Sequence, residues 1–175
     1  MTAGDVGERW DELARRAGAG APRDEDPLAD LRELLVLWMD GDPYAVPVER
    51  VREIVRLRSI TPVPRVPTAV RGVISLRGEI VQVIDLRRRL GLAAAEPTGR
   101  QRIVVLHGED GQLSGLLVDR VSEVLRVPGE WLRPPASRDA DAVVALVPHA
   151  RGFVSLFDVD RLLDLGRLGE RAATA

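Results

Sequence analysis

The apolar positions from residue 34 onward follow the short periods that indicate β-strands. Residues 34–39 form an apolar run that ends at the turn signal Asp-Gly-Asp-Pro of residues 40–43. Apolar and other residues alternate over 44–48, which is typical of a strand with one buried face. A further apolar segment follows at 51–55. This stretch therefore predicts three short strands.

A Pro-rich stretch then leads to a hairpin and a helix. Residues 61–67 are dense enough in Pro to suggest an exposed recognition loop. Two strands are predicted at about 71–76 and 79–84, on either side of the turn Arg77-Gly78. Residues 85–91 predict a short helix, because an Asp opens the segment as N-cap and a Gly ends it.

The second half of the chain repeats the first at two slightly different offsets. With an offset of 70, seven of the 18 positions from 40 to 57 are identical, including the Asp-Gly turn and an Arg-Val-x-Glu pattern. With an offset of 73, five of the 13 positions from 80 to 92 are identical, including the Asp that opens each terminal helix. Because these polar landmarks recur in the same order, we infer an internal duplication.

Each half thus offers about five short strands followed by a helix. Antiparallel sheets of this size usually curl and close, since closure removes exposed edges. We predict a mainly β fold of two small five-stranded β-barrel subdomains side by side. Short helices are expected at the N-terminus, after the fourth strand region of the first half and at the C-terminus. The groove between two such units is a natural binding site.

An N-terminal extension is predicted over residues 1–32. Residues 8–17 place Trp10 and Leu13 on one apolar stripe of a short amphipathic helix, and an acidic linker follows. A helix of this length is marginal alone, so it docks on the body, binds a partner or frays. Trp10 and Leu13 are the candidate contacts if it binds a partner.

Composition excludes several kinds of chemistry. All 25 basic residues are Arg, and the chain contains no Lys, Cys or Asn. Without Lys there is no Schiff base and no phosphate-binding GxxxxGK[ST] loop. Without Cys there is no thiolate nucleophile, disulfide or Cys-based metal site. A G+C-rich genome alone would explain these absences, but they exclude the chemistry whatever their origin.

Size and charge favour a cytoplasmic globular protein. The 175 residues are 45% apolar, without a run of the roughly 20 residues that span a bilayer, and the acidic N-terminus does not resemble a signal peptide. Residues 1–33 carry nine acids against five Arg, and residues 34–175 carry eighteen against twenty. Neither part has the clustered positive charge of a nucleic-acid-binding surface.

No catalytic or metal-binding constellation emerges. His107 and His149 are isolated from each other in the sequence, so a metal site is not expected. No Ser lies in a GxSxG elbow. The run of three Arg at 87–89 is interpreted as an exposed helix face. We therefore expect no enzymatic activity, no cofactor and no small-molecule substrate.

A framework of Gly and Arg at residues 71–78 is the most distinctive local feature. Gly72 and Gly78 bracket one strand, where Gly permits a positive φ or a close backbone approach. Arg77 lies on the turn, and Glu53 is its predicted ionic partner. From spacing alone, an ordinary surface ion pair worth about 0–1 kcal/mol remains the simpler interpretation.

These motifs closely resemble the CheW family of bacterial chemotaxis coupling proteins. The likeness rests on VRGVISLRG at 70–78 followed by VIDL at 83–86, and it spans roughly residues 33–166. Flanking segments share the likeness: 44–48 (YAVPV), 51–54 (VREI), 60–64 (ITPVP), 115–121 (GLLVDRV) and 157–163 (FDVDRLL).

The resemblance implies a fold, a function and a site. It implies two interleaved SH3-like barrels in a domain over 33–170, with halves at about 33–92 and 101–165 and a tail at 171–175. It implies a non-catalytic adaptor that links chemoreceptor signalling tips to the regulatory domain of a CheA-type histidine kinase, in a two-component system. In the family the receptor tip lies in the groove between subdomains. The positions that match the receptor-facing motif are Val51, Glu53, Gly72, Arg77 and Gly78.

Two positions depart from the family pattern. Ser75 stands where the family usually has Asn, and a hydroxyl replaces a two-sided amide. Gln82 stands where the family usually has Pro, and it restores a backbone donor that can affect an edge pairing. With the extension, these departures suggest a second hypothesis: a scaffold of a non-flagellar chemosensory pathway that recruits another partner through residues 1–32.

A third hypothesis belongs to another class. A small β-barrel that binds nucleic acid, or an enzyme on the same fold, would need a basic stripe with exposed aromatic residues or converging titratable groups. The chain has six aromatic residues in total. The adaptor hypothesis is therefore preferred.

Overall fold

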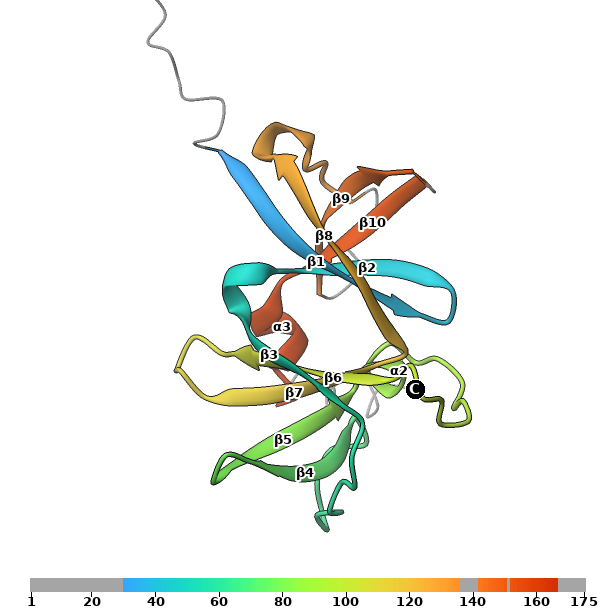
Figure 1. Ribbon diagram of the computed structural model, residues 1–175, viewed down its shortest axis with the longest axis vertical. Helices are drawn as coiled ribbons and strands as arrows, with labels where there is room; N and C mark the ends of the chain where they lie inside the picture. The colour runs from blue at the N-terminus through green and yellow to red at the C-terminus, as the bar shows by residue number, and fades with distance from the viewer. Residues whose placement is uncertain (1–29, 136–141, 151, 167–175) are drawn as a thin grey trace, which may run out of the picture. The chain divides into compact units, whose positions relative to one another are not determined.

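The computed structural model describes residues 30–135, 142–150 and 152–166 (Figure 1). The chain divides into two units, residues 1–31 and 32–175, and the fold below belongs to the second. The helix predicted at 8–17, with Trp10 and Leu13, lies outside the described residues. None of the helices in the described part is long and apolar enough to cross a membrane.

The first half of the domain forms five strands and a short helix, as the pattern predicts. Its elements are β1 (Leu31–Met39), β2 (Asp42–Pro47), the 3-10 helix η1 (Val48–Arg50), β3 (Val51–Arg56), β4 (Val70–Leu76), β5 (Glu79–Asp85) and α2 (Leu86–Arg89).

The second half repeats this order. Its elements are β6 (Arg102–His107), β7 (Leu113–Val118), β8 (Arg120–Pro128), the 3-10 helix η2 (Gly129–Trp131), β9 (Val143–His149), β10 (Gly152–Phe157) and α3 (Val159–Leu163). The expected mainly β fold of two small five-stranded units is confirmed. One detail is wrong: α2 follows the fifth strand of its half, because the Arg77-Gly78 turn separates two complete strands.

The two sheets exchange strands between the halves. Sheet A has the order β8-β1-β2-β10-β9, and sheet B has the order β3-β6-β7-β5-β4. In Figure 1 the blue β1 and β2 accordingly lie among the orange strands, and the yellow β7 lies among the green ones. Exchanging each strand for its counterpart in the other half converts one order into the other. The duplication is therefore a structural symmetry, although neither half forms a sheet alone.

The exchange leaves one parallel pair in each otherwise antiparallel sheet, β10 with β2 and β5 with β7. The expectation of purely antiparallel sheets is corrected at these two pairs. The edges of each sheet approach each other through one short bridge. Thr61 pairs with Val73 in sheet B, and Arg133 pairs with Leu146 in sheet A. These bridges partly close each sheet into a barrel.

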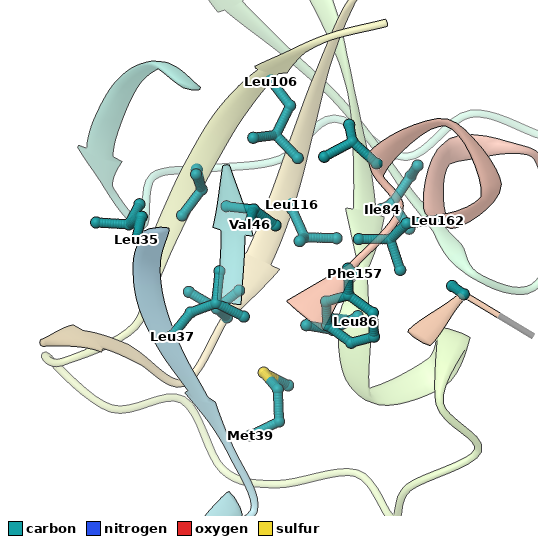
Figure 2. Packing of buried hydrophobic residues seen from close by; sticks show 14 of the residues in the cluster. Leu35, Leu37, Met39, Val46, Ile84, Leu86, Leu106, Leu116, Phe157 and Leu162 are labelled. Atoms are coloured by element: carbon teal, nitrogen blue, oxygen red, sulfur yellow. The ribbon is translucent and has the colours of Figure 1, made fainter. Parts of the chain in front are cut away.

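A single apolar core joins the sheets. Side chains from β1, β2 and β10 of sheet A meet those from β5, β6 and β7 of sheet B, and Figure 2 shows them converging. Residues 34–39 are all buried, because one face of β1 packs in this shared core and Leu34 packs in a second cluster inside sheet A. Phe157 stacks on Tyr44 with ring centroids 4.9 Å apart.

Both short helices begin at the predicted caps. The Asp85 carboxylate accepts a hydrogen bond from the backbone N–H of Arg88, and the Asp158 carboxylate accepts two from the first turn of α3. Each cap satisfies N–H groups that have no partner within the helix. Because these caps end β5 and β10, they fix where each half turns back over the core.

Candidate functional site

The predicted site lies where the β4–β5 hairpin approaches β3. An Arg77 guanidinium nitrogen lies 3.3 Å from a carboxylate oxygen of Glu53, so the predicted ion pair is present. The Glu53 side chain is 20% exposed, whereas that of Arg77 is 71% exposed. Most of the guanidinium therefore faces solvent and can reach a second carboxylate.

The turn that carries Arg77 has an unusual backbone. Leu76 pairs with Glu79, so Arg77 and Gly78 form a two-residue hairpin loop. Their φ angles are 51° and 86°, both positive, as a type I′ turn requires. Gly adopts such a φ freely, but an Arg there costs about 1 kcal/mol or more. The fold thus holds an exposed cation in a conformation that favours Asn, Asp or Gly.

Other polar contacts hold this hairpin against the segment that precedes it. Arg52 forms a second ion pair across the same junction, 2.8 Å from Glu79. Arg58 donates a hydrogen bond of 3.2 Å to the carbonyl oxygen of Ser75. The two ion pairs cross between β3 and the hairpin, so they restrict how the turn is presented.

Gly72 is required by a close backbone approach. A Cβ atom at this position would lie 2.1 Å from the carbonyl oxygen of Thr61, and the φ of Gly72 is 143°. Thr61 exchanges two backbone hydrogen bonds of 2.9 Å with Val73, which brings its carbonyl to this point. Gly72 therefore allows the backbone pairing of Thr61 with Val73 that closes the barrel. It affects the site by positioning β4 and does not contact a partner through a side chain.

Two register irregularities shape the surface. In β3 the pairing with β6 shifts between Val51 and Glu53, and in β4 the pairing with β5 shifts between Val70 and Gly72. Each extra residue is an Arg, and each makes an ion pair: Arg52 with Glu79, and Arg71 with Asp85. Bulges redirect side chains and bend strands. Nothing in the periodicity of the sequence signals them.

The five candidate residues occupy three places. Glu53, Arg77 and Gly78 surround the ion pair, and Gly72 lies further along β4 in the barrel closure. Val51 begins β3, half-buried, and packs against the shared core. It therefore anchors the strand that carries Glu53.

The two positions that depart from the resemblance lie on the β4–β5 hairpin. Ser75 pairs with Ile80, and Gln82 pairs with Val73. Gln82 also pairs with Ser114 of β7, so β5 has neighbours on both sides. The expectation that Gln82 affects an edge pairing is therefore wrong, because sheet B places this strand inside. Ser75 is exposed.

The run of three Arg at 87–89 is not simply an exposed face. Arg87 donates to both carboxylate oxygens of Asp119, at 2.9 and 2.6 Å, and its side chain is only 13% exposed. Arg89 is buried and donates to the carbonyl oxygens of Leu162 and Arg161 in α3. The bonds of Arg89 join the helices of the two halves, and those of Arg87 join α2 to the residue between β7 and β8. The earlier interpretation is corrected because the helix packs into the junction.

A similar junction is formed by Arg50 and Asp160. The guanidinium of Arg50 contacts both carboxylate oxygens of Asp160 and also donates to the carbonyl oxygen of His107. The hydrogen bond from Arg50 lowers the pKa of Asp160 below its usual value, although burial opposes it. At Asp119 burial acts to raise the pKa, but the bonds from Arg87 and Asp40 outweigh it and the pKa is lowered. Both carboxylates are charged structural bridges at neutral pH.

The described residues contain no group of three or more acidic or His side chains that could hold a metal ion. The backbone carbonyl of His107 accepts hydrogen bonds from Arg50, and the His149 ring lies 3.5 Å from Glu123, with both residues in sheet A. The charged side chains around the hairpin form pairs with one another.

Comparisons with known proteins agree with one another. The family model described as CheW-like domain matches residues 33–167. The chain is 30% identical over 136 residues to Chemotaxis protein CheW of Bacillus subtilis, covering 75% of this chain and 86% of that protein. It is 40% identical over 103 residues to Chemotaxis protein CheW of Rhizobium meliloti, covering 59% of this chain and 66% of that protein.

A third relative and a solved structure extend the comparison. Protein FrzA of Myxococcus xanthus is 36% identical over 128 residues, covering 70% of this chain and 79% of that protein. The crystal structure of scaffolding protein TtCheW from Thermoanaerobacter tengcongensis superposes with a TM-score of 0.71 at 28% identity. That match covers 76% of this chain and 92% of the other.

Proposed function

This chain belongs to the family of CheW-like domains, a family of non-catalytic chemotaxis scaffolds, and on that premise we propose that it couples chemoreceptors to a kinase. On the receptor side, it binds the cytoplasmic signalling tip of a helical bundle. On the kinase side, it binds the regulatory domain of a CheA-type histidine kinase. The protein works in the cytoplasm, at the inner face of the membrane, through its receptor partners.

The observation that carries the receptor site is the exposed, strained Arg77. Its side chain is 71% exposed and its φ is 51°. Strained residues persist where the surrounding structure imposes them, and they cluster at binding sites. The exposed pair with Glu53 gives little stability in return, because solvent screens it. The position of Arg77 is therefore better explained by recognition of a partner than by folding.

The chemistry of Arg77 suits a carboxylate on a receptor helix. Its planar guanidinium can hold Glu53 with one nitrogen and present the others to a partner carboxylate. Val51 and Gly72 support this surface by packing and by close backbone approach. No surface is assigned to the kinase.

The test is charge reversal with a matched control. Arg77→Glu should keep the circular dichroism spectrum and weaken binding to a receptor signalling bundle at least tenfold. The control is Arg126→Glu, since Arg126 is equally exposed at 72% and is also paired, with Glu33, but lies on β8 of sheet A. Wild-type affinity in the Arg77 variant would refute the site.

A charge swap separates direct contact from support. The double variant Glu53→Arg with Arg77→Glu restores an intramolecular pair but places the wrong charge toward the partner. If Arg77 contacts the receptor, this double variant stays weak. Recovery of binding would show that only the pair within the protein matters.

The family match begins at residue 33 and leaves the N-terminal extension outside it. That boundary favours, as a second candidate, recruitment of another partner through residues 1–32. Co-sedimentation with receptor membranes and kinase, with and without residues 1–32, distinguishes the two. Loss of an additional protein, with receptor and kinase retained, supports the second candidate.

A further inference from the structure

A groove of about 340 Å³ lies where the linker between the two halves passes the ends of two strands. Its walls come from the end of β1, the start of β8, α2 and the segment 95–101. A groove of this volume can hold a small molecule. None of the five candidate receptor residues lines it, so it is separate from the site described above.

The groove contains positive charge that the protein does not neutralise. Among the described residues that line it, five are charged, and three of these are Arg. Arg87 is already neutralised by its ion pair with Asp119. The guanidinium groups of Arg100 and Arg120 form no ion pair or hydrogen bond in the described part of the chain. Glu96, the other acid of the groove, is exposed and forms an ion pair with neither of them.

The Arg120 guanidinium is held in place by an aromatic ring. It lies over the indole of Trp38, 4.3 Å from the ring centroid. Trp38 is itself buried, and its Nε1 donates a hydrogen bond of 2.9 Å to the hydroxyl of Ser122. Stacking uses the face of the guanidinium plane and leaves the N–H groups at its edge able to donate. Arg120 is therefore a positioned donor in the wall of the groove.

Two more cations lie beside the groove, directly opposite each other. Arg56 of β3 pairs in register with Arg102 of β6. The Arg102 guanidinium donates to the carbonyl oxygens of Gly99 and Gln101, at 2.9 and 2.7 Å, so its charge lies against the segment that forms the wall. Arg56 is exposed and forms no ion pair with the described residues. Like charges directly opposite each other destabilise a sheet, and a bound anion offsets that repulsion.

We propose that this groove binds a small molecule through a phosphate group. The N–H groups of Arg100 and Arg120 donate to the phosphate oxygens, because two guanidinium forks match the geometry and the double charge of a phosphate. A carboxylate carries a single charge and would leave one of the two Arg without a partner. The inference goes beyond the proposed function, since it adds a ligand site whose residues take no part in receptor binding.

The experiment uses the full chain and inorganic pyrophosphate as the probe. In NMR titrations at constant ionic strength, pyrophosphate should shift the backbone resonances of Ala95, Thr98 and Arg120 to saturation, with a Kd of about 1 mM or lower. Sodium chloride added to the same ionic strength should leave these resonances in place. Shifts that do not saturate, or that sodium chloride reproduces, would overturn the proposal.

Variants locate the binding. Arg100→Gln should weaken pyrophosphate binding about fivefold without changing thermal unfolding, because this exposed side chain has no polar partner in the described part of the chain. The control is Arg133→Gln, an exposed Arg in the segment that pairs with β9 of sheet A, and it should keep wild-type affinity.

A second variant tests the sign of the charge. Glu96→Gln removes the unpaired acid of the groove and should strengthen pyrophosphate binding about twofold. Wild-type affinity in Arg100→Gln, or weaker binding in Glu96→Gln, would overturn the proposal. Receptor binding by Arg100→Gln should equal that of the wild type, so failure of this inference leaves the proposed function untouched.

Discussion

The faces of the two barrels carry the same backbone features and different side chains. Both have a bulge in the first strand of the terminal hairpin, at Arg71 in one half and Val144 in the other. Exposed apolar residues also recur: Ile54 corresponds to Val124, and Ile80 to Phe153. Four charged positions around the hairpin do not recur: Arg52 corresponds to Ser122, Arg71 to Val144, Arg77 to Ala150 and Glu79 to Gly152.

One acid is common to both faces and meets a different partner on each. Glu53 pairs with the exposed Arg77, whereas Glu123 lies 3.5 Å from His149, whose side chain is only 10% exposed. Bulges, hairpins and caps are set by backbone geometry and therefore persist in both halves. Exposed side chains carry little of the folding free energy, so their chemistry is free to diverge. We therefore expect the partner to bind the face formed by β3 and the β4–β5 hairpin, which carries Glu53 and Arg77.

The largest difference between the halves should appear at the barrel closure. Gly72→Ala places a Cβ 2.1 Å from the Thr61 carbonyl and forces a positive φ, so it should lower the free energy of unfolding by about 2–3 kcal/mol. The counterpart change, Ala145→Gly, should cost only about 1 kcal/mol. Urea unfolding measures both. A loss for Gly72→Ala no larger than that for Ala145→Gly would show that the Thr61 carbonyl does not exclude a Cβ at position 72.

The two junction carboxylates should confer the next largest effect, and it depends on pH. The folded pKa of Asp160 lies below its usual value of 3.8, so its contribution is complete above that pH and disappears as pH falls through the folded pKa. Asp160→Asn should lower the free energy of unfolding by about 1 kcal/mol at neutral pH. It should also flatten the acid limb of the stability curve.

Asp119→Asn tests the other junction in the same way, because the pKa of Asp119 is also lowered. Its loss should likewise vanish in acid. Chemical denaturation between pH 7 and pH 3 gives both curves. A loss that persists unchanged at pH 3 in either variant would contradict the role of that carboxylate charge.

A substitution of Arg77 should change the free energy of unfolding and receptor binding in opposite directions. Arg77→Asn relieves an unfavourable φ of 51° and should raise the free energy of unfolding by about 0.5 kcal/mol, even though the exposed ion pair is lost. It should still weaken binding of the receptor bundle. Thermal unfolding and a binding titration on the same sample measure the two effects. A destabilised variant would show that the pair with Glu53 outweighs the strain.

The smallest effects on stability are expected for Glu53 and Glu123, which should differ in their effect on receptor binding. Glu53→Gln and Glu123→Gln should each change the free energy of unfolding by less than about 0.5 kcal/mol, because one member of each contact is solvent-exposed, Arg77 in the first and Glu123 in the second. Only Glu53→Gln should alter receptor binding. If Glu123→Gln weakens receptor binding equally, the face of sheet A that carries Glu123 and His149 also belongs to the site.

Several elements could be predicted from the sequence because their signals are local. The hairpin around Arg77-Gly78 and the caps Asp85 and Asp158 lie where the turn and cap residues indicate. The pair of Glu53 with Arg77 was also predicted, and 3.3 Å separates the two groups. Other features could not be found in this way, among them the burial of Arg89 and the inside position of Gln82.

The sequence by itself determined the strands, the turns, the duplication and the family. These depend on residues that are neighbours along the chain, or on repeats that can be aligned without a structure. Only the tertiary structure decided that the halves exchange strands, that Thr61 closes on Gly72 and that Arg89 is buried against α3. Those features depend on which distant segments bury each other's apolar faces. Arg77 illustrates both cases. Neighbouring residues determine its turn, whereas its position beside Glu53 of β3 depends on the tertiary structure.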